Sequence, residues 1–185
     1  MALKLVTAPA EEPVTLAEAK LHLRETETAL DALIQSLIVA ATAHAEDFTG
    51  RRLVTQTWDY FLDAFPCWGI AIPYPPLASI TSIKYVDTEG VEQTLASSEY
   101  LVDVKSSPGR VTPAYGKTWP SIRSQMNAVT IRFVAGYGLH AAVPEKIRNA
   151  CLLHIEAHHN RDEKQMATLI QAAENLMRAY CLYRF

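Results

Sequence analysis

Apolar residues recur at steps of three and four in four segments, the spacing of one face of an α-helix. The first two helices are predicted from about Leu16 to Arg24 and from a start signal at Thr28 to about Thr49, and the last two begin at Pro144 and just before Met166. Thr15 and Glu18 have the spacing of a capping box, and Gly50 stands where a left-handed C-cap is needed. We therefore expect two helices near each end of the chain.

The middle of the chain has a different pattern, in which β-branched and aromatic residues are interrupted by proline and glycine. The expected strands are Thr55 to Leu62, Ile80 to Val86, Gln93 to Leu95, Tyr100 to Val104 and Val129 to Val134. The second and third strands should form a hairpin, because Asp87 to Gly90 is a short link that contains glycine. The stretch from Ser106 to Gln125 lacks a periodic pattern and is expected to be an exposed loop.

These elements predict an α+β fold that is mainly a helical bundle of about four helices, with a β-rich insertion between the second and third helices. Residues 1–185 should form one domain, with N-terminal helices in 1–52, the β-rich insertion in 53–138, and C-terminal helices with a terminal segment in 139–185. Each helix pair has an apolar face, so the helices from the two ends should pack together.

Composition limits the classes of function. The chain has 185 residues, 49% of them hydrophobic, and a formal net charge of -3, which argues for a folded protein and against a surface built for phosphate contacts. The cysteines Cys67, Cys151 and Cys181 form no metal or disulfide pattern, so a reducing compartment is expected. No signal peptide and no membrane span are predicted.

A histidine cluster in the third helix is the main candidate for chemistry. His154 and His158 are one helical turn apart and could bind a metal together, which would suit a small metal-dependent enzyme or regulator. Glu156 does not directly follow the first histidine, as it would in zinc proteases, and no third ligand is nearby. A structural role, with His154 and His158 partly buried and His159 in solvent, is the favoured interpretation, so we expect no metal and no cofactor.

Other motifs give weaker signals for catalysis. Gly136 and Gly138 lack the third glycine of a dinucleotide fingerprint and are expected to form a turn with positive φ. Asp59 and Asp63 could pair as acid and base, but exposed polar positions on an amphipathic strand explain them more simply. With no catalytic motif, the chain is not expected to be an enzyme.

The last residues are aromatic and basic where a terminus is usually polar. The residues proposed for partner binding are Tyr180, Leu182, Tyr183, Arg184 and Phe185. Aromatic residues and arginine often anchor protein interfaces, so a partner is the favoured interpretation. The alternative is that this segment folds back onto its own core.

Several stretches occur together in a familiar order. They are PVTLAEAKLHLR (Pro13 to Arg24), Asp31 to Trp58, SITSIKY (Ser79 to Tyr85), YGKTWP (Tyr115 to Pro120), VTIRFVAGYG (Val129 to Gly138) and VPEKI (Val143 to Ile147). Over nearly its whole length the chain resembles the head-to-tail connector (adaptor) proteins of long-tailed bacteriophages and prophages.

This resemblance implies a structural virion protein in the neck between head and tail, assembled in the cytoplasm of the bacterial host. It implies a homo-oligomeric ring, commonly a dodecamer, under the portal protein, with a tail or neck completion protein as the next partner. DNA would pass through the channel without sequence-specific binding, and no membrane would be involved. In related adaptors the C-terminal segment reaches into the portal, which agrees with the interpretation of Tyr180 to Phe185.

Overall fold

The computed structural model describes residues 2–160 and 163–182. They fold into two compact units: a β unit of residues 2–8 and 55–136, and a helical unit of residues 9–54 and 137–182. Each unit has its own cluster of buried apolar side chains.

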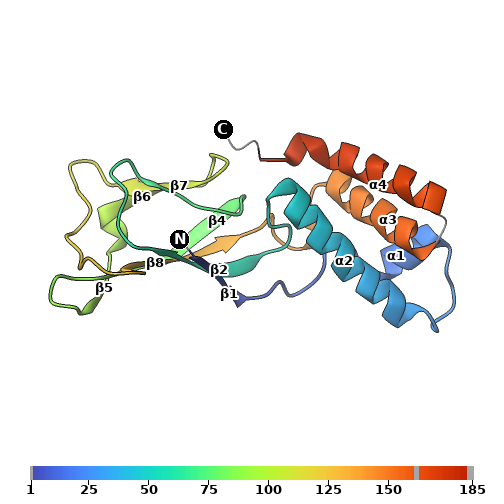
Figure 1. The fold of residues 1–185 in the computed structure, drawn as a ribbon, viewed down its shortest axis with the longest axis horizontal. Coiled ribbons are helices and arrows are strands. Elements are labelled where there is room, and N and C mark those ends of the chain that lie inside the picture. The colour runs from blue at the N-terminus through green and yellow to red at the C-terminus, as the bar shows by residue number, and fades with distance from the viewer. Residues whose placement is uncertain (1, 161–162, 183–185) are drawn as a thin grey trace. The chain divides into compact units, whose positions relative to one another are not determined.

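Four α-helices form the helical unit: α1 (Leu16–Leu23), α2 (Asp31–Thr49), α3 (Glu145–His159) and α4 (Glu163–Met177). Figure 1 shows α2, α3 and α4 side by side, and all four helices contribute to one apolar core. Ile34 and Ile38 of α2 and Ile147 and Ile155 of α3 are at most 1% exposed, at the positions that the helical period assigns to the inner face. The four predicted helices and their mutual packing are confirmed.

Local signals set the helix ends as expected. Thr15 accepts a hydrogen bond from the backbone N–H of Glu18, and the Glu18 carboxylate accepts one from the backbone N–H of Thr15, which is a complete capping box. Gly50 ends α2 with φ of 68°, a conformation that costs glycine little.

The β unit contains eight strands among the described residues, in two antiparallel sheets. One sheet has the order β1-β2-β8-β4-β5, formed by β1 (Ala2–Thr7), β2 (Gln56–Leu62), β8 (Val129–Ala135), β4 (Leu77–Val86) and β5 (Glu92–Thr94). The other has the order β3-β7-β6, formed by β3 (Ile70–Ala71), β7 (Arg110–Pro113) and β6 (Tyr100–Asp103). The predicted hairpin is confirmed, since β4 and β5 pair with Lys84 opposite Thr94.

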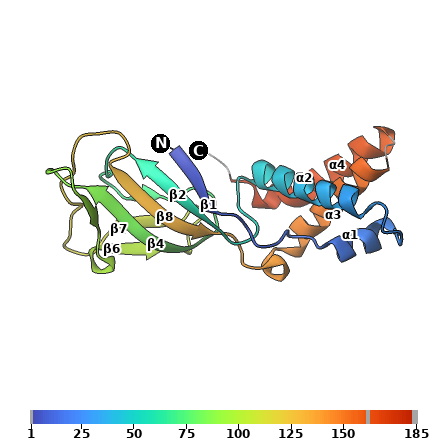
Figure 2. The same cartoon turned by 90° about the horizontal axis from the view of Figure 1, so that it is seen from below.

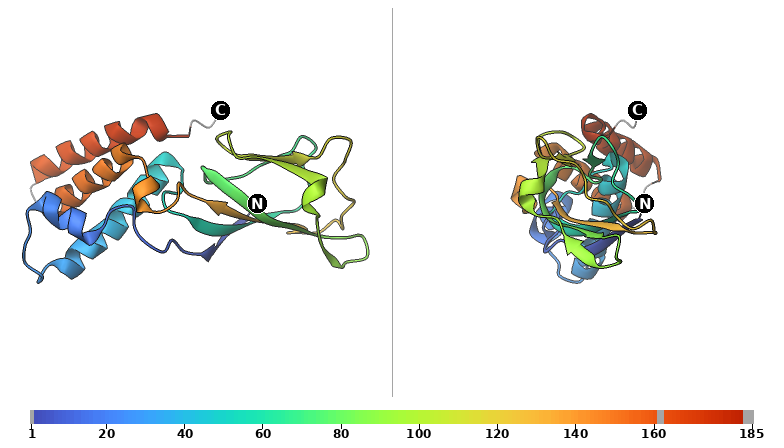
Figure 3. Two further views of the ribbon diagram at one scale, coloured as in Figure 1. Left: turned by 180° about the vertical axis from the view of Figure 1, so that it is seen from behind. Right: turned by 90° about the vertical axis from the view of Figure 1, so that its left-hand side faces the viewer.

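Figures 2 and 3 show the strands of the β unit from further directions, and in Figure 3 one sheet lies over the other. Ile83, Ile131 and Phe133 from the larger sheet and Val111 from the smaller sheet are fully buried in one shared core. Two facing sheets can bury their apolar faces against each other, so the strands do not depend on the helices for a core.

The prediction of a mainly helical bundle with a β-rich insertion is therefore wrong, because the strands form a body with its own core. That body is also not a simple insertion, because β1 comes from the start of the chain and pairs with β2. Residues 110–113, which were expected to lie in an exposed loop, form the central strand of the smaller sheet. None of the helices among the described residues is long and apolar enough to span a membrane.

A charged pair crosses between the central strands of the larger sheet. Asp59 of β2 lies opposite Arg132 of β8, and both guanidinium–carboxylate distances are 2.8 Å. Asp59 is only 8% exposed, so the expectation of an exposed polar position is wrong for this residue. The hydrogen bonds with Asp59 raise the pKa of Arg132, and the bidentate contact compensates for burial of the carboxylate.

Replacing Arg132 with methionine should lower the free energy of unfolding by about 2 kcal/mol, because it leaves a buried carboxylate without its cation. The double variant Asp59→Asn/Arg132→Met should be closer to wild type than Arg132→Met alone. Urea unfolding measures both. The control is Lys84→Met, which removes an exposed pair with Glu92 and should cost less than about 0.5 kcal/mol; equal losses for Arg132→Met and Lys84→Met would contradict the prediction.

Candidate partner-binding surfaces

The described part of the C-terminal segment lies against the end of α2. The Arg51 guanidinium Nε donates to the carbonyl of Tyr180 at 2.6 Å, and the N–H of Leu182 donates to the carbonyl of Thr49 at 3.2 Å. The Cys181 thiol lies 3.5 Å from the carbonyl of Phe48 and donates to it. Backbone and side-chain donors of this segment thus satisfy carbonyls that the last turn of a helix leaves without partners.

Close packing accompanies these hydrogen bonds. A Cβ atom at Gly50 would lie 3.4 Å from Cδ1 of Leu182, so the glycine at the helix end also leaves room for this side chain. Tyr180 and Leu182 are both half-buried. The segment up to Leu182 therefore contacts its own chain, while Tyr183, Arg184 and Phe185 of the predicted docking set lie outside the described residues. Binding of a partner by this set stays a prediction.

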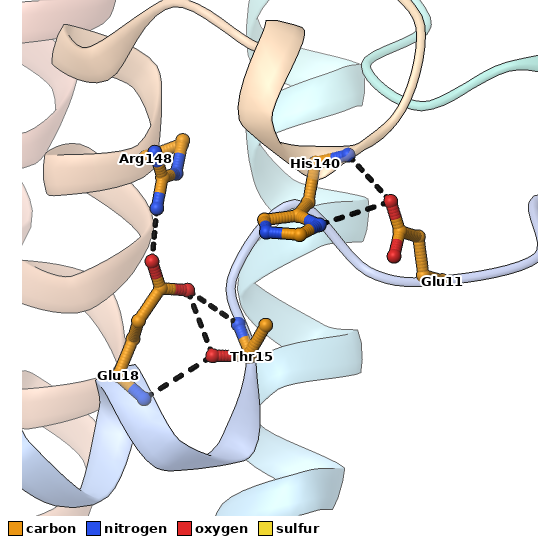
Figure 4. A network of polar contacts seen from close by, with 5 residues as sticks. All are labelled: Glu11, Thr15, Glu18, His140 and Arg148. Carbon is orange, nitrogen blue, oxygen red and sulfur yellow. Dashed lines mark hydrogen bonds and ion pairs between the residues drawn. The ribbon is translucent and has the colours of Figure 1, made fainter.

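An ion pair between Glu18 and Arg148 and a contact between Glu11 and His140 fix the start of α1 against the chain around α3 (Figure 4). Glu11 accepts hydrogen bonds from the backbone N–H of His140 at 2.6 Å and lies 3.0 Å from its Nδ1. The bonds from the backbone and side chain of His140 lower the pKa of Glu11. Burial opposes ionisation of Glu18, but hydrogen bonds from Thr15 and the charge of Arg148 outweigh it and lower the pKa of Glu18.

A hollow of about 380 Å³ lies next to this network, between α1 and α3. Its lining combines charged and polar side chains with apolar ones: Val14, Glu18, Leu21, His22, Glu145, Arg148, Asn149 and Leu152. Glu18 is bound to Arg148, and His22 lies 2.9 Å from Glu156. Leu21, 82% exposed, gives the hollow an apolar rim suited to protein contact.

Three histidine rings stack between α2 and α3. The ring centroids of His44 and His154 are 4.6 Å apart and those of His154 and His158 are 4.4 Å apart, with interplanar angles of 25° and 31°. Burial lowers the pKa of His154 to about 4, and the neighbouring rings of His44 and His158 add to this effect. His159 is half-buried beside Glu25 rather than in solvent, which corrects one detail of the sequence interpretation.

This arrangement does not suit the metal-dependent alternative. The lone pair of an imidazole lies in the ring plane, so the stacked rings of His44 and His154 direct their lone pairs alongside one another rather than toward one ion. No group of three or more potential ligands that could hold a metal occurs among residues 2–160 and 163–182. Burial also raises the pKa of the Cys151 thiol to about 12, which keeps this nearby sulfur protonated.

The remaining sequence candidates have structural roles. Gly136 and Gly138 have φ of 121° and 134°, as expected for the turn between β8 and α3. Asp63 accepts a hydrogen bond from the backbone N–H of Asn127 at 2.8 Å and so joins two loops of the β unit. Asp59 and Asp63 therefore have separate partners and do not form an acid–base pair.

The sequence interpretation missed an exposed apolar surface on those two loops. Trp68, Tyr115 and Met126 are 96%, 102% and 83% exposed. The loops that carry them are joined by Trp119, whose indole N–H donates to the carbonyl of Pro66 at 3.0 Å and whose ring stacks on Phe65 at a centroid distance of 4.7 Å. Aromatic residues between prolines and glycines in 63–69 and 114–126 were the available signal.

The exposed apolar side chains are typical of a protein that binds other proteins through its surface. The family model of phage gp6-like head-tail connector proteins matches residues 13–103. No curated protein sequence matches the chain significantly.

Solved structures with a similar fold come from gene transfer agent (GTA) particles. The neck of an empty particle, computed with C6 symmetry, has a chain 25% identical with a TM-score of 0.83. The virion of a native particle has one 27% identical with a TM-score of 0.80, and the neck of a native particle, computed with C12 symmetry, has one 26% identical with a TM-score of 0.78. Each match covers 100% of this chain and 97% of the other.

The matched family model and the neck structures support a head-tail connector family for this chain. It is a structural connector subunit of the virion and not an enzyme, so the family, function and location expected from the resemblance are confirmed.

The histidine stack should make the helical unit sensitive to acid. The pKa of His154 is about 4 in the folded chain and near 6.5 when exposed, so the unfolded chain takes up the proton first. Stability should fall as the pH decreases from 6.5 toward 4 and should change little further below 4, with a loss of about 2 kcal/mol by pH 5. Chemical unfolding of the wild type at pH 7, 6 and 5 measures this loss.

Replacing His154 with phenylalanine keeps a stacked ring but removes the titrating group, so the loss between pH 7 and pH 5 should shrink. His22→Gln is the matched control, because this histidine lies at the surface and its loss should leave the acid sensitivity in place. An unchanged pH dependence in His154→Phe would show that other groups cause it.

Proposed function

We propose that the chain forms a homo-oligomeric ring in the neck of the virion, docks under the portal protein and presents a surface to a tail or neck completion protein. The observation that carries this proposal is the match over 100% of the chain to subunits of GTA necks. A match over the full length includes both units and the segment that precedes residue 182, so it supports a common assembly role rather than a shared domain alone.

We favour twelve copies, the smallest ring that fits both symmetries reported for GTA necks. A ring of twelve identical subunits also obeys six-fold symmetry, because C6 is a subgroup of C12, whereas a ring of six obeys only the lower symmetry. DNA would pass through the channel of this ring without sequence-specific binding. The net charge of -3 supports that role, since attraction of phosphates by an excess of basic residues would hold the DNA back.

The portal contact is assigned to the C-terminal segment, Tyr180 to Phe185. Arg51 and the carbonyls of Phe48 and Thr49 hold the start of this segment to the end of α2. A segment anchored at its base loses less conformational entropy on binding than a free tail. Tyr180 and Leu182 would set its direction, and Tyr183, Arg184 and Phe185 would provide aromatic and cationic side chains for the contact.

Removal of Tyr183, Arg184 and Phe185 should reduce binding to portal rings from the same genome by at least tenfold, because it removes the proposed anchor side chains. Co-sedimentation with purified portal rings measures binding. The variant should unfold at the same urea concentration as wild type, since the contacts of Arg51 and Leu182 remain.

A second variant tests the packing of Leu182 against α2 separately from the portal contact of the last three residues. Leu182→Ala keeps the three terminal residues but weakens the packing beside Gly50, so it should bind the portal more weakly than wild type and more tightly than the truncated chain. Equal binding by wild type and the truncated chain would remove the terminal segment from the proposal, and no binding by wild type would count against portal docking as a whole.

A further inference from the structure

The two sheets of the β unit have four edge strands, β1 and β5 in the larger sheet and β3 and β6 in the smaller. An edge strand directs alternate N–H and C=O groups away from its only neighbour, where another strand can pair with them. Soluble proteins usually prevent such pairing with short, polar or irregular edges.

Two of these edges are protected in that way. β5 has three residues, Glu92, Gln93 and Thr94, all polar and exposed, and β3 has only two residues. Neither strand offers a ladder of useful length or an apolar surface.

The other two edges are apolar and exposed. In β1, Leu5 and Val6 are each 41% exposed. In β6, Leu101 is 58% exposed and Val102 is 37% exposed, and Val104 just beyond the strand is 44% exposed. Successive side chains of a strand lie on opposite faces of the sheet, so β6 lacks full cover on both faces.

The two exposed edges also match each other. β1 pairs regularly with β2 from Ala2 to Leu5, before a bulge, and β6 pairs regularly with β7 from Tyr100 to Asp103, so each edge has four regular residues. Lys4 is the charged residue of the first strand and Asp103 that of the second, and their charges are opposite.

We propose that β1 of one subunit pairs with β6 of the next subunit in the ring. This inference rests on the proposed ring. A closed ring of more than two identical subunits needs two different surfaces that fit each other, because a surface that fits itself stops at a dimer. β1 and β6 are the edges of different sheets, so their pairing can repeat from subunit to subunit, and each contact joins the larger sheet of one copy to the smaller sheet of the other.

Hydrogen exchange of the wild-type protein tests this pairing without any substitution. Amides in residues 2–5 and 100–103 that exchange rapidly in the free subunit should exchange at least tenfold more slowly in purified assembled necks, and both segments should change together. β5, the internal control, should be unchanged. Protection of only one segment, or of neither, in necks that contain the chain would overturn the proposal, whereas absence of the chain from purified necks would instead count against the proposed function.

Charge substitutions at the two edges provide an independent test. Leu5→Lys and Leu101→Lys should each raise the protein concentration needed for ring formation at least tenfold, because each places a charge at the new contact. In the antiparallel register that places Lys4 opposite Asp103, Leu5 lies opposite Val102. Leu5→Lys/Val102→Glu should therefore recover part of the loss, and Leu5→Lys/Val102→Lys should not. Gln93→Lys on β5 is the matched control and should behave as wild type.

Sedimentation velocity measures ring formation, with twelve 20.5-kDa subunits as the expected species, and circular dichroism checks that each variant is folded. Folded Leu5→Lys and Leu101→Lys proteins that form rings at the wild-type concentration would overturn the proposal. The same conclusion would follow if the Lys/Glu and Lys/Lys double variants were equally defective.

Discussion

Several arrangements in this molecule depend on backbone amides and carbonyls that have no hydrogen-bond partner within their own helix or sheet. The end of α2 leaves carbonyls unpaired, and residues 181 and 182 approach to satisfy two of them. The start of α1 leaves amides unpaired, and Thr15 and Glu18 close it as a capping box. The edge strands β1 and β6 each pair their backbone groups with one neighbouring strand only. A buried unpaired amide or carbonyl costs as much as a lost hydrogen bond, so the groups at these helix ends require partners within the chain, whereas the exposed edges of β1 and β6 can also bond to water.

Sequence patterns were sufficient for the helices and for most of the strands. Apolar periodicity located α1 to α4, and Thr15, Gly50 and Pro144 marked their ends because capping depends on residues close together in the chain. Three strands, β1, β3 and β7, were missed for a physical reason. β1 is largely exposed, β3 has only two residues, and β7 (Arg110–Pro113) lies in a stretch without alternation. All three are strands because of their partners rather than their own composition.

The predicted fold class was wrong because pairing between these strands creates a second sheet. Once β7 joins β3 to β6, the smaller sheet can cover the larger one, and the strands gain a core that no local pattern reveals. The same limit applies to side chains. His154 and His158 were found from helical spacing, but the stacked ring of His44 comes from another helix, and Asp59 is paired with a residue 73 positions away in the sequence. Contacts over such separations depend on the tertiary fold.

The two buried clusters share no residue, and each is filled by its own unit. Changes in separate, non-contacting sites usually add in their effects on stability, so the two cores can vary in sequence without compensating for each other. An assembly protein with this construction can adjust one set of surfaces to a changing neighbour while the other set is conserved by its own neighbour. The separate cores thus let a substitution inside one unit leave the packing of the other unit unchanged.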